Sequence, residues 1–396
     1  MLNNIRIPYP LIEPIVDRLA IAPVRSPKKS THPSQIDYLP MPSNPTKLSN
    51  LFDCCIHAGQ KYHKFHPYLH IHHPYPRALA LFFHKASTTL DETYLDLTEL
   101  SRRLQITIIA PELPGCGQST LQPTYNNLIR IAETFSEFAV KERVRIEKWV
   151  EKQQRPLSPA KQLPNKHLPL ILIGESLGTG SASYIAARHS AEYEAVIMLA
   201  SFTSVAEMAD TILTGHWASR SVSGHHFDNL TELPKYDGPV LLVHGREDEV
   251  VPPEHAVELT NALNRRSTDA IVESVYVPWE KHWLSYDGIC GRDDGTGPGG
   301  INRFMDMMGW SKRVTDDPVG SLVDRFPDPF QPIFEPVGPP LPDTPPSRPS
   351  LPSRVSSRIS RKVQYCVQLG RELRQLWKDL TPRSRNQRSS QPIRTI

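Results

Sequence analysis

Short apolar segments alternate with longer amphipathic segments from residue 78 to residue 311, and this alternation constrains the fold more than any other feature of the chain. The apolar segments are continuous, which is typical of parallel strands that are covered on both faces. The segments between them are long enough to form crossover helices. The sequence therefore predicts an α/β fold, a mostly parallel central sheet with helices on both faces. The predicted strands are 79–84, 106–110, 169–173, 195–200, 239–244 and 271–277, and the predicted helices are 92–104, 124–151, 177–190, 202–213, 253–264 and 300–310.

Proline marks the limits of the predicted fold. The chain has 39 prolines in 396 residues, nearly twice the usual share of about 5 per cent, and they are dense near the N-terminus and from Pro318 to Pro352. Proline removes a backbone donor and fixes φ, so these segments are not expected to form helices or central strands. We predict four parts: a Pro-rich, disordered N-terminal extension (1–47), an α/β domain (48–315), a Pro-rich, disordered linker (316–352) and a basic tail (353–396).

Residues 48–73 are predicted to add an antiparallel edge to the sheet, with a chain reversal near Gly59. Six histidines lie from His57 to His73, but their spacing is irregular and no ordered set of His, Cys and Asp ligands accompanies them. We therefore expect exposed histidines on a strand and a loop. We predict no metal site and no cofactor.

The chain shows no signal for membrane insertion or secretion. Its longest apolar runs fall far short of the about 20 residues that a membrane-spanning helix needs, and prolines and acidic residues interrupt the N-terminus before the apolar part of a secretory signal can form. Five cysteines, an odd number without metal-ligand spacing, are typical of reduced thiols in an intracellular protein. We expect a cytoplasmic protein.

A glycine-rich turn follows the predicted strand 169–173. Its sequence is Gly174-Glu175-Ser176-Leu177-Gly178, a pattern that is weak alone but much stronger between an apolar strand and a helix of small residues. Such a turn holds the serine in a strained conformation, and its small neighbours let the chain pass closely. We interpret Ser176 as a candidate nucleophile. The alternative is a glycine-rich strand-to-helix turn without chemistry.

A serine hydroxyl near its free pKa needs an adjacent base that a third group orients. If the turn is a nucleophile elbow, the acid and then the histidine follow later in the chain. Asp248 lies in the turn after the predicted strand 239–244, where a carboxylate can point toward the serine loop. Glu247 and Glu249 are rivals for this role, and a solvated acidic loop is the alternative.

His282 is the histidine placed just beyond the last predicted strand, and we interpret it as the candidate base. His255 belongs to a predicted helix, and His225 and His226 lie in a connecting loop. Each of these three is alternatively a surface residue, as most histidines are.

The run from Ala78 to about Trp283 resembles the α/β-hydrolase superfamily, and within it the small intracellular serine hydrolases of the protein-depalmitoylating and serine-aminopeptidase-like branches. This resemblance covers about half of the chain and neither flank. The matching segments are FFH (82–84), APELPGCGQS (110–119), GESLGTG (174–180), SFTSVAEMA (201–209), FDNL (227–230) and PVLLVHGREDEVVP (239–252).

The resemblance implies a role for each site residue. Ser176 corresponds to the nucleophile, Asp248 to the orienting acid and His282 to the general base. The backbone N–H groups of Leu177 and Ala86 correspond to the two oxyanion donors.

Two lysines depart from the family pattern. Lys85 stands where the family usually has glycine, which lets the backbone turn freely and aim its N–H at the oxyanion. Lys281 stands where glycine commonly precedes the catalytic histidine. We expect Lys85 to strain the oxyanion loop, so that Lys85→Gly raises turnover.

The function that follows is a serine hydrolase, esterase-like or thioesterase-like, that cleaves an acyl group through an acyl-serine intermediate. The predicted cap, 201–238, must also hold a helix and is short, and an open site suits an acyl chain carried on a lipidated or membrane-associated partner. Two alternatives stand beside this reading. One is a catalytically weak or inactive binding or scaffold protein on the hydrolase fold, and the other is an aminopeptidase-like serine peptidase.

The tail 353–396 has eleven basic and two acidic residues, a net charge of +9, which leaves −6 on the rest of the chain. Apolar residues recur in it at helical spacing, which predicts a basic amphipathic helix over about 359–380. Such a helix binds an anionic membrane surface or a protein partner, or it docks on the domain. We expect no specific nucleic-acid binding. Salt-dependent co-sedimentation with anionic liposomes tests peripheral attachment to a membrane.

Overall fold

Eight strands form one sheet in the computed structural model, which describes residues 36–41, 65–73, 75–154, 167–213, 227–291, 300–310 and 312. The strand order is β1-β2-β4-β3-β5-β6-β7-β8. The pairs from β4 to β8 are parallel, and β2 is antiparallel to both β1 and β4. The strands are β1 (Ile36–Pro40), β2 (Phe65–Ile71), β3 (Ala78–Phe83), β4 (Ile106–Pro111), β5 (Leu170–Glu175), β6 (Ala195–Leu199), β7 (Val240–Gly245) and β8 (Val272–Val277).

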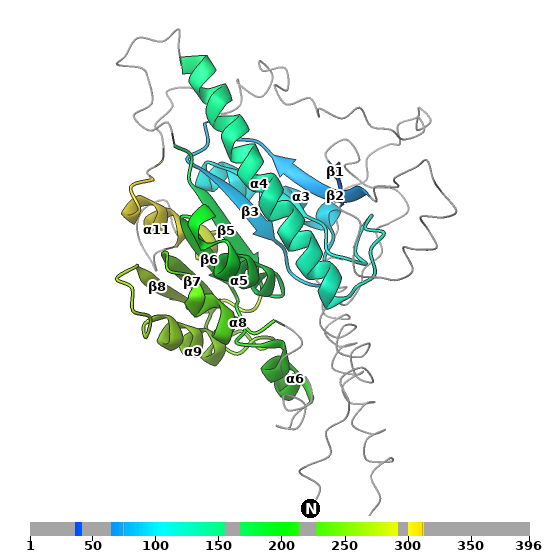
Figure 1. Cartoon of the computed structure of the whole chain (residues 1–396). Coiled ribbons are helices and arrows are strands. Elements are labelled where there is room, and N and C mark those ends of the chain that lie inside the picture. Colours follow the sequence, from blue (N-terminus) through cyan, green and yellow to red (C-terminus); the bar gives the residue numbers. More distant parts are fainter. Residues whose placement is uncertain are drawn as a thin grey trace, which may run out of the picture.

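Helices cover both faces of this sheet (Figure 1). One face packs against α4, α5 and α9, and the other packs against α3, α10 and α11. The described α-helices are α3 (Leu90–Leu104), α4 (Tyr125–Gln154), α5 (Gly178–Arg188), α6 (Val205–Leu213), α8 (Asn229–Glu232), α9 (Glu254–Leu263), α10 (Tyr286–Cys290) and α11 (Ile301–Met307), and the short 3-10 helices are η3 (Ser190–Glu192) and η4 (Leu233–Lys235).

The central strands are apolar throughout because successive side chains enter two different cores. In β3, Leu79, Leu81 and Phe83 join the core under α4 and α5. Ala78, Ala80 and Phe82 join the core under α3 and α11. All six are at most 3 % exposed. The predicted α/β fold and its six strands are confirmed, and each of the six predicted helices overlaps an observed one.

The sheet also contains a strand that the sequence did not predict. Strand β1 (Ile36–Pro40) lies inside the predicted N-terminal extension 1–47 and pairs with β2 over five residues. The strand tolerates Pro40 because it lies at the edge of the sheet and the proline is its last residue. The folded part therefore begins before residue 48, and β2, the predicted antiparallel edge, lies one strand inside.

The predicted exposure of the histidines on β2 is wrong for two of them. His66 is fully buried, its Nε2 lies 2.7 Å from the backbone oxygen of Glu112, and its ring packs edge-on against Phe135. The side chain of His70 is 5 % exposed. Within the described ranges, no group of three His, Cys, Asp or Glu side chains is placed to hold a metal ion.

Burial of His66 is expected to make the fold sensitive to acid. Burial, helped by the charges of Arg130 and His84 and opposed by the hydrogen bond with Glu112, lowers the pKa of His66 to about 4. The unfolded chain, with a histidine pKa of about 6.5, therefore binds more protons than the native state as the pH falls from about 6.5 to 4. Over that window this one group removes about 3 kcal/mol from the free energy of unfolding.

Urea denaturation at pH 7 and at pH 4.5 measures this loss. The variant His66→Gln is expected to lose less stability between these two pH values than the wild type does. The control is His167→Gln, because the side chain of His167 is 59 % exposed. Equal pH dependence in the wild type and His66→Gln would show that the buried imidazole is not the source.

Several predicted segments lie outside the described residues. They include the chain reversal near Gly59, the linker 316–352 and the basic helix over 359–380. In the part of the chain that is described, no helix is both long and apolar enough to cross a membrane.

Candidate active site

Ser176 lies in the sharp turn between β5 and α5. Its φ of 52° is in the left-handed region, which costs energy for a residue with a side chain. The backbone N–H of Ser176 donates to the carbonyl of Leu199 on β6, and its carbonyl accepts from the N–H of Thr179. The turn is therefore fixed on both sides, and it presents the serine at the carboxyl end of the sheet.

Two glycines allow this turn because other backbone segments lie too close to leave room for a side chain at either position. A Cβ at Gly178 would collide with the carbonyl oxygen of Phe83 at the end of β3. A Cβ at Gly174 would lie 2.6 Å from the Cα of Thr179. A side chain at Gly178 would push the serine turn away from the end of β3, and one at Gly174 would push strand β5 away from the start of α5.

Asp248 and His282 follow the last two parallel strands, β7 and β8, and both meet Ser176. The Nδ1 atom of His282 lies 2.8 Å from Oδ2 of Asp248, and its Nε2 atom lies 3.0 Å from Oγ of Ser176. Asp248 and His282 are each 5 % exposed. The three residues that the sequence singled out therefore form one continuous chain of hydrogen bonds.

The carboxyl group of Asp248 is held in its charged form. Burial opposes ionisation, but hydrogen bonds from His244 and His282 outweigh it and keep the pKa of Asp248 well below its ordinary value. The other oxygen, Oδ1, accepts from the backbone N–H groups of Val250 and Val251, both at 2.9 Å. Because ionised Asp248 can only accept, Nδ1 of His282 carries the proton and Nε2 is free to accept from the serine hydroxyl.

The loop after β3 approaches the serine turn from the other side. Ala86 and Leu177 pack in the same apolar cluster. The N–H of Leu177 lies at the N-terminal end of α5, where the first N–H groups have no acceptor within the helix. These are the two backbone positions that the sequence resemblance assigned to an oxyanion.

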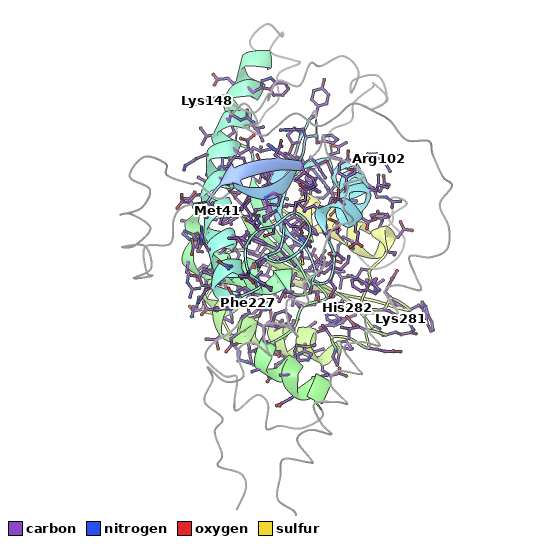
Figure 2. All side chains as sticks on the ribbon, turned by 90° about the vertical axis from the view of Figure 1, so that its right-hand side faces the viewer. Met41, Arg102, Lys148, Phe227, Lys281 and His282 are labelled. Atoms are coloured by element: carbon purple, nitrogen blue, oxygen red, sulfur yellow. The ribbon has the colours of Figure 1, made fainter. Side chains whose placement is uncertain are left out.

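The expected strain at Lys85 is not present. The positive φ in this loop belongs to Ser87, at 62°, and not to Lys85. A glycine is therefore not required at position 85, and the reason given above for a gain of activity in Lys85→Gly is wrong. Lys281 is 64 % exposed in its side chain, and Figure 2 shows it at the outer margin of the molecule beside His282.

The rival residues do not reach the serine. Glu247 and Glu249 are exposed on the loop that carries Asp248. The Nδ1 atom of His255 lies 2.7 Å from the hydroxyl oxygen of Thr203, on the loop after β6. His225 and His226 lie outside the described residues.

Comparison with known proteins gives matches over the same part of the chain. Residues 167–289 match the model of the prolyl oligopeptidase family. The human protein "Alpha/beta hydrolase domain-containing protein 17B" is 27 % identical over 194 residues, which are 48 % of this chain and 57 % of that protein, and its Xenopus laevis counterpart gives the same figures. This chain therefore spans little more than half the length of those relatives.

Solved structures of similar fold include TT1662 from Thermus thermophilus and Est1E from Butyrivibrio proteoclasticus. Both are 18 % identical to this chain and have a TM-score of 0.39. The first match covers 56 % of this chain and 87 % of TT1662, and the second covers 58 % of this chain and 90 % of Est1E.

The chain has the fold of the α/β-hydrolase superfamily. Its strand order, the serine turn after β5 and the sequence relatives agree on this assignment.

The site contains supporting residues whose role could not be assigned from the sequence. The Nε2 atom of His244, at the end of β7, lies 3.3 Å from Oδ2 of Asp248 and 2.8 Å from the carbonyl oxygen of Val251. Like His282, it contacts Oδ2 of the acid. Its position in the same strand-to-turn segment as Asp248 is the signal that would have found it.

A buried carboxyl group, that of Glu112, contacts both ends of the loop after β3. Glu112 is 2 % exposed, and its Oε1 lies 3.3 Å from Nε2 of His84, where the loop begins. Its Oε2 accepts from the N–H of Leu90, where the loop ends and α3 begins. One carboxyl group thus holds both ends of the segment that carries Ala86.

The surroundings of the serine are apolar on the side of the cap. Leu177 packs with buried side chains from four places: the loop that follows β4, helix α4, helix α6 and the loop that carries Asp248. Met208 of α6 is half-buried against them. The buried members are Leu113, Cys116, Leu128, Leu177, Phe202, Val205, Phe227 and Val251. Figure 2 shows Phe227 in the same lower part of the molecule as His282.

Proposed function

We propose that this hydrolase cleaves esters or thioesters through an acyl-serine intermediate on Ser176. The observation that carries the proposal is the hydrogen-bond chain from Asp248 through His282 to Ser176, in a turn whose backbone is strained. A serine, a base and an ionised orienting acid in contact are the requirements for activating a hydroxyl as a nucleophile.

Each residue of the site has one step in the proposed reaction. The Oγ atom of Ser176 attacks the carbonyl carbon while Nε2 of His282 takes the hydroxyl proton, and Asp248 stabilises the imidazolium that forms. The oxyanion accepts hydrogen bonds from the N–H groups of Leu177 and Ala86. The intermediate collapses as His282 gives the proton to the leaving alcohol or thiol.

Water completes the cycle in the reverse sense. His282 takes a proton from a water molecule, the resulting hydroxide attacks the acyl carbon, and the carboxylic acid leaves as Oγ of Ser176 takes the proton back. No oxidant, reductant or cofactor is consumed in either half.

An acyl group is the substrate part that fits the surroundings of Ser176. Leu177, next to the nucleophile, belongs to an apolar cluster with Phe202, and such surroundings are compatible with hydrocarbon rather than with a charged or hydrogen-bonding group. A binding protein on this fold would not need the triad, and the backbone at Lys85 does not have the positive φ that would call for a glycine there.

A fluorophosphonate probe and a substrate panel test the proposal. The wild type is expected to be labelled, Ser176→Ala is not, and octanoyl esters and thioesters are hydrolysed faster than acetyl esters and aminoacyl anilides. An unlabelled wild type would support the binding-protein alternative. Preference for aminoacyl anilides would support the peptidase alternative.

A further inference from the structure

Lys85 contacts two other loops of the site through one ammonium group. Its Nζ lies 2.7 Å from Oε1 of Glu175 and 4.8 Å from the ring centroid of Trp283. Each of these residues is the sequence neighbour of a residue in the proposed mechanism. Lys85 precedes Ala86, Glu175 precedes Ser176, and Trp283 follows His282.

The contact with Glu175 is a partly buried, charge-assisted hydrogen bond. The side chains of Lys85 and Glu175 are 18 % and 15 % exposed. Solvent screens such a pair less than it screens surface pairs, and removing one partner leaves a charge without compensation. The pair therefore restrains the loop after β3 against the serine turn after β5.

The contact with Trp283 extends the restraint to the histidine loop. The ring of Trp283 lies edge-on to the imidazole of His282, with ring centroids 5.1 Å apart and an angle of 69° between the planes. A cation over the face of a tryptophan is attracted by the ring, most strongly where water is partly excluded. Lys85 thus holds the aromatic ring against which the proposed base packs.

Lys281 shows that proximity in sequence alone does not produce such a restraint. It immediately precedes His282, but its Nζ lies 3.8 Å from Oε1 of Glu249, and the two side chains are 64 % and 84 % exposed. Exposed pairs of this kind contribute little. The two lysines that depart from the family pattern are therefore in different physical situations.

We propose that Lys85 is a positioning residue. Through Glu175 and Trp283 it holds the loop of Ala86, the serine turn and the loop of His282 in fixed relative positions. The proposal rests on the proposed function of Ser176 and His282. It assigns to Lys85 a role opposite to the one expected from the sequence, because it supports the site instead of disturbing it.

The test compares Lys85→Met, Glu175→Gln and their double variant in steady-state hydrolysis of a p-nitrophenyl ester. Each single variant is expected to lower kcat about 10- to 100-fold with little change in KM, because small misplacement of reacting groups costs that much in rate. The double variant is expected to be no worse than the single variants, since both remove the same contact. Lys85→Arg, which keeps the charge, is expected to recover most of the rate.

Lys281→Met is the matched control, and its kcat is expected to stay within about threefold of the wild type because an exposed pair contributes little. Additive losses in the double variant, or equal losses in Lys85→Met and Lys281→Met, would overturn the proposal. A rate for Lys85→Met equal to that of the wild type would also overturn it. If Lys85→Met does not fold, Glu175→Gln and Lys85→Arg decide the question in the same assay.

Hydrogen exchange separates this proposal from the proposed function. If the wild type is neither labelled nor active, the proposed function fails, and the amide exchange of residues 84–89 and 278–284 judges the restraint by itself. Faster exchange of both segments in Lys85→Met than in Lys281→Met supports it. Unchanged exchange in both segments overturns it.

Discussion

Ser176→Ala and His282→Ala are each expected to lower kcat by about four to six orders of magnitude, and the double variant is expected to be little worse than either. The reason is that the two side chains act as one unit. Without Ser176 there is no nucleophile. Without His282, whose Nε2 lies 3.0 Å from the serine hydroxyl in the wild type, no base takes the hydroxyl proton. Single-turnover and steady-state hydrolysis of the same ester measure both effects.

His255→Ala is the matched control for this prediction. His255 is also buried and also lies near the carboxyl end of the sheet, but its imidazole contacts Thr203 instead of Ser176. Near-normal turnover is expected, together with some loss of stability from the broken hydrogen bond. If His255→Ala lost activity while His282→Ala kept it, the assignment of the base would be wrong.

The parallel core of the sheet could be predicted because burial on both faces makes its strands continuously apolar. Strand β1 could not, since it has only five residues, ends in proline and lies in a proline-rich segment. Its place depends on antiparallel pairing with β2, in which Ile36 lies opposite Leu69. Pairing of that kind between distant segments leaves no local periodicity to read.

The three residues of the hydrogen-bond chain could be predicted because each follows the carboxyl end of a parallel strand. Such ends meet at one edge of the sheet, so the topology brings Ser176, Asp248 and His282 together once the strand order is known. The contacts that support them were not visible in the same way. Nothing in the local sequence indicates that Lys85 reaches Glu175, which is 90 residues away.

The wrong expectation at Lys85 has the same physical origin. The sequence shows that lysine stands where the family has glycine, and from this alone one expects a strained backbone at position 85. The outcome depends instead on the φ at that position, which is not positive, and on where a long side chain finds a partner. Neither quantity is a property of the residue type alone.

Asp248→Asn is expected to lower kcat by about three to four orders of magnitude while the protein remains folded. The loop determines how the asparagine would sit. Two backbone N–H groups, from Val250 and Val251, point at one side-chain oxygen, so the amide oxygen of asparagine takes that place and its NH₂ group faces His282. That group would donate to Nδ1 and move the imidazole proton to Nε2, which could then no longer accept from Ser176.

The variant also removes the negative charge that stabilises the imidazolium in the transition state. Circular dichroism and thermal unfolding are expected to show a folded protein, and steady-state hydrolysis is expected to show the loss in kcat. Glu249→Gln is the control, because it makes the same chemical change one residue away on an exposed side chain. A loss of less than about tenfold in Asp248→Asn would contradict this prediction. It would mean that His282 keeps its orientation and its tautomer without the carboxylate.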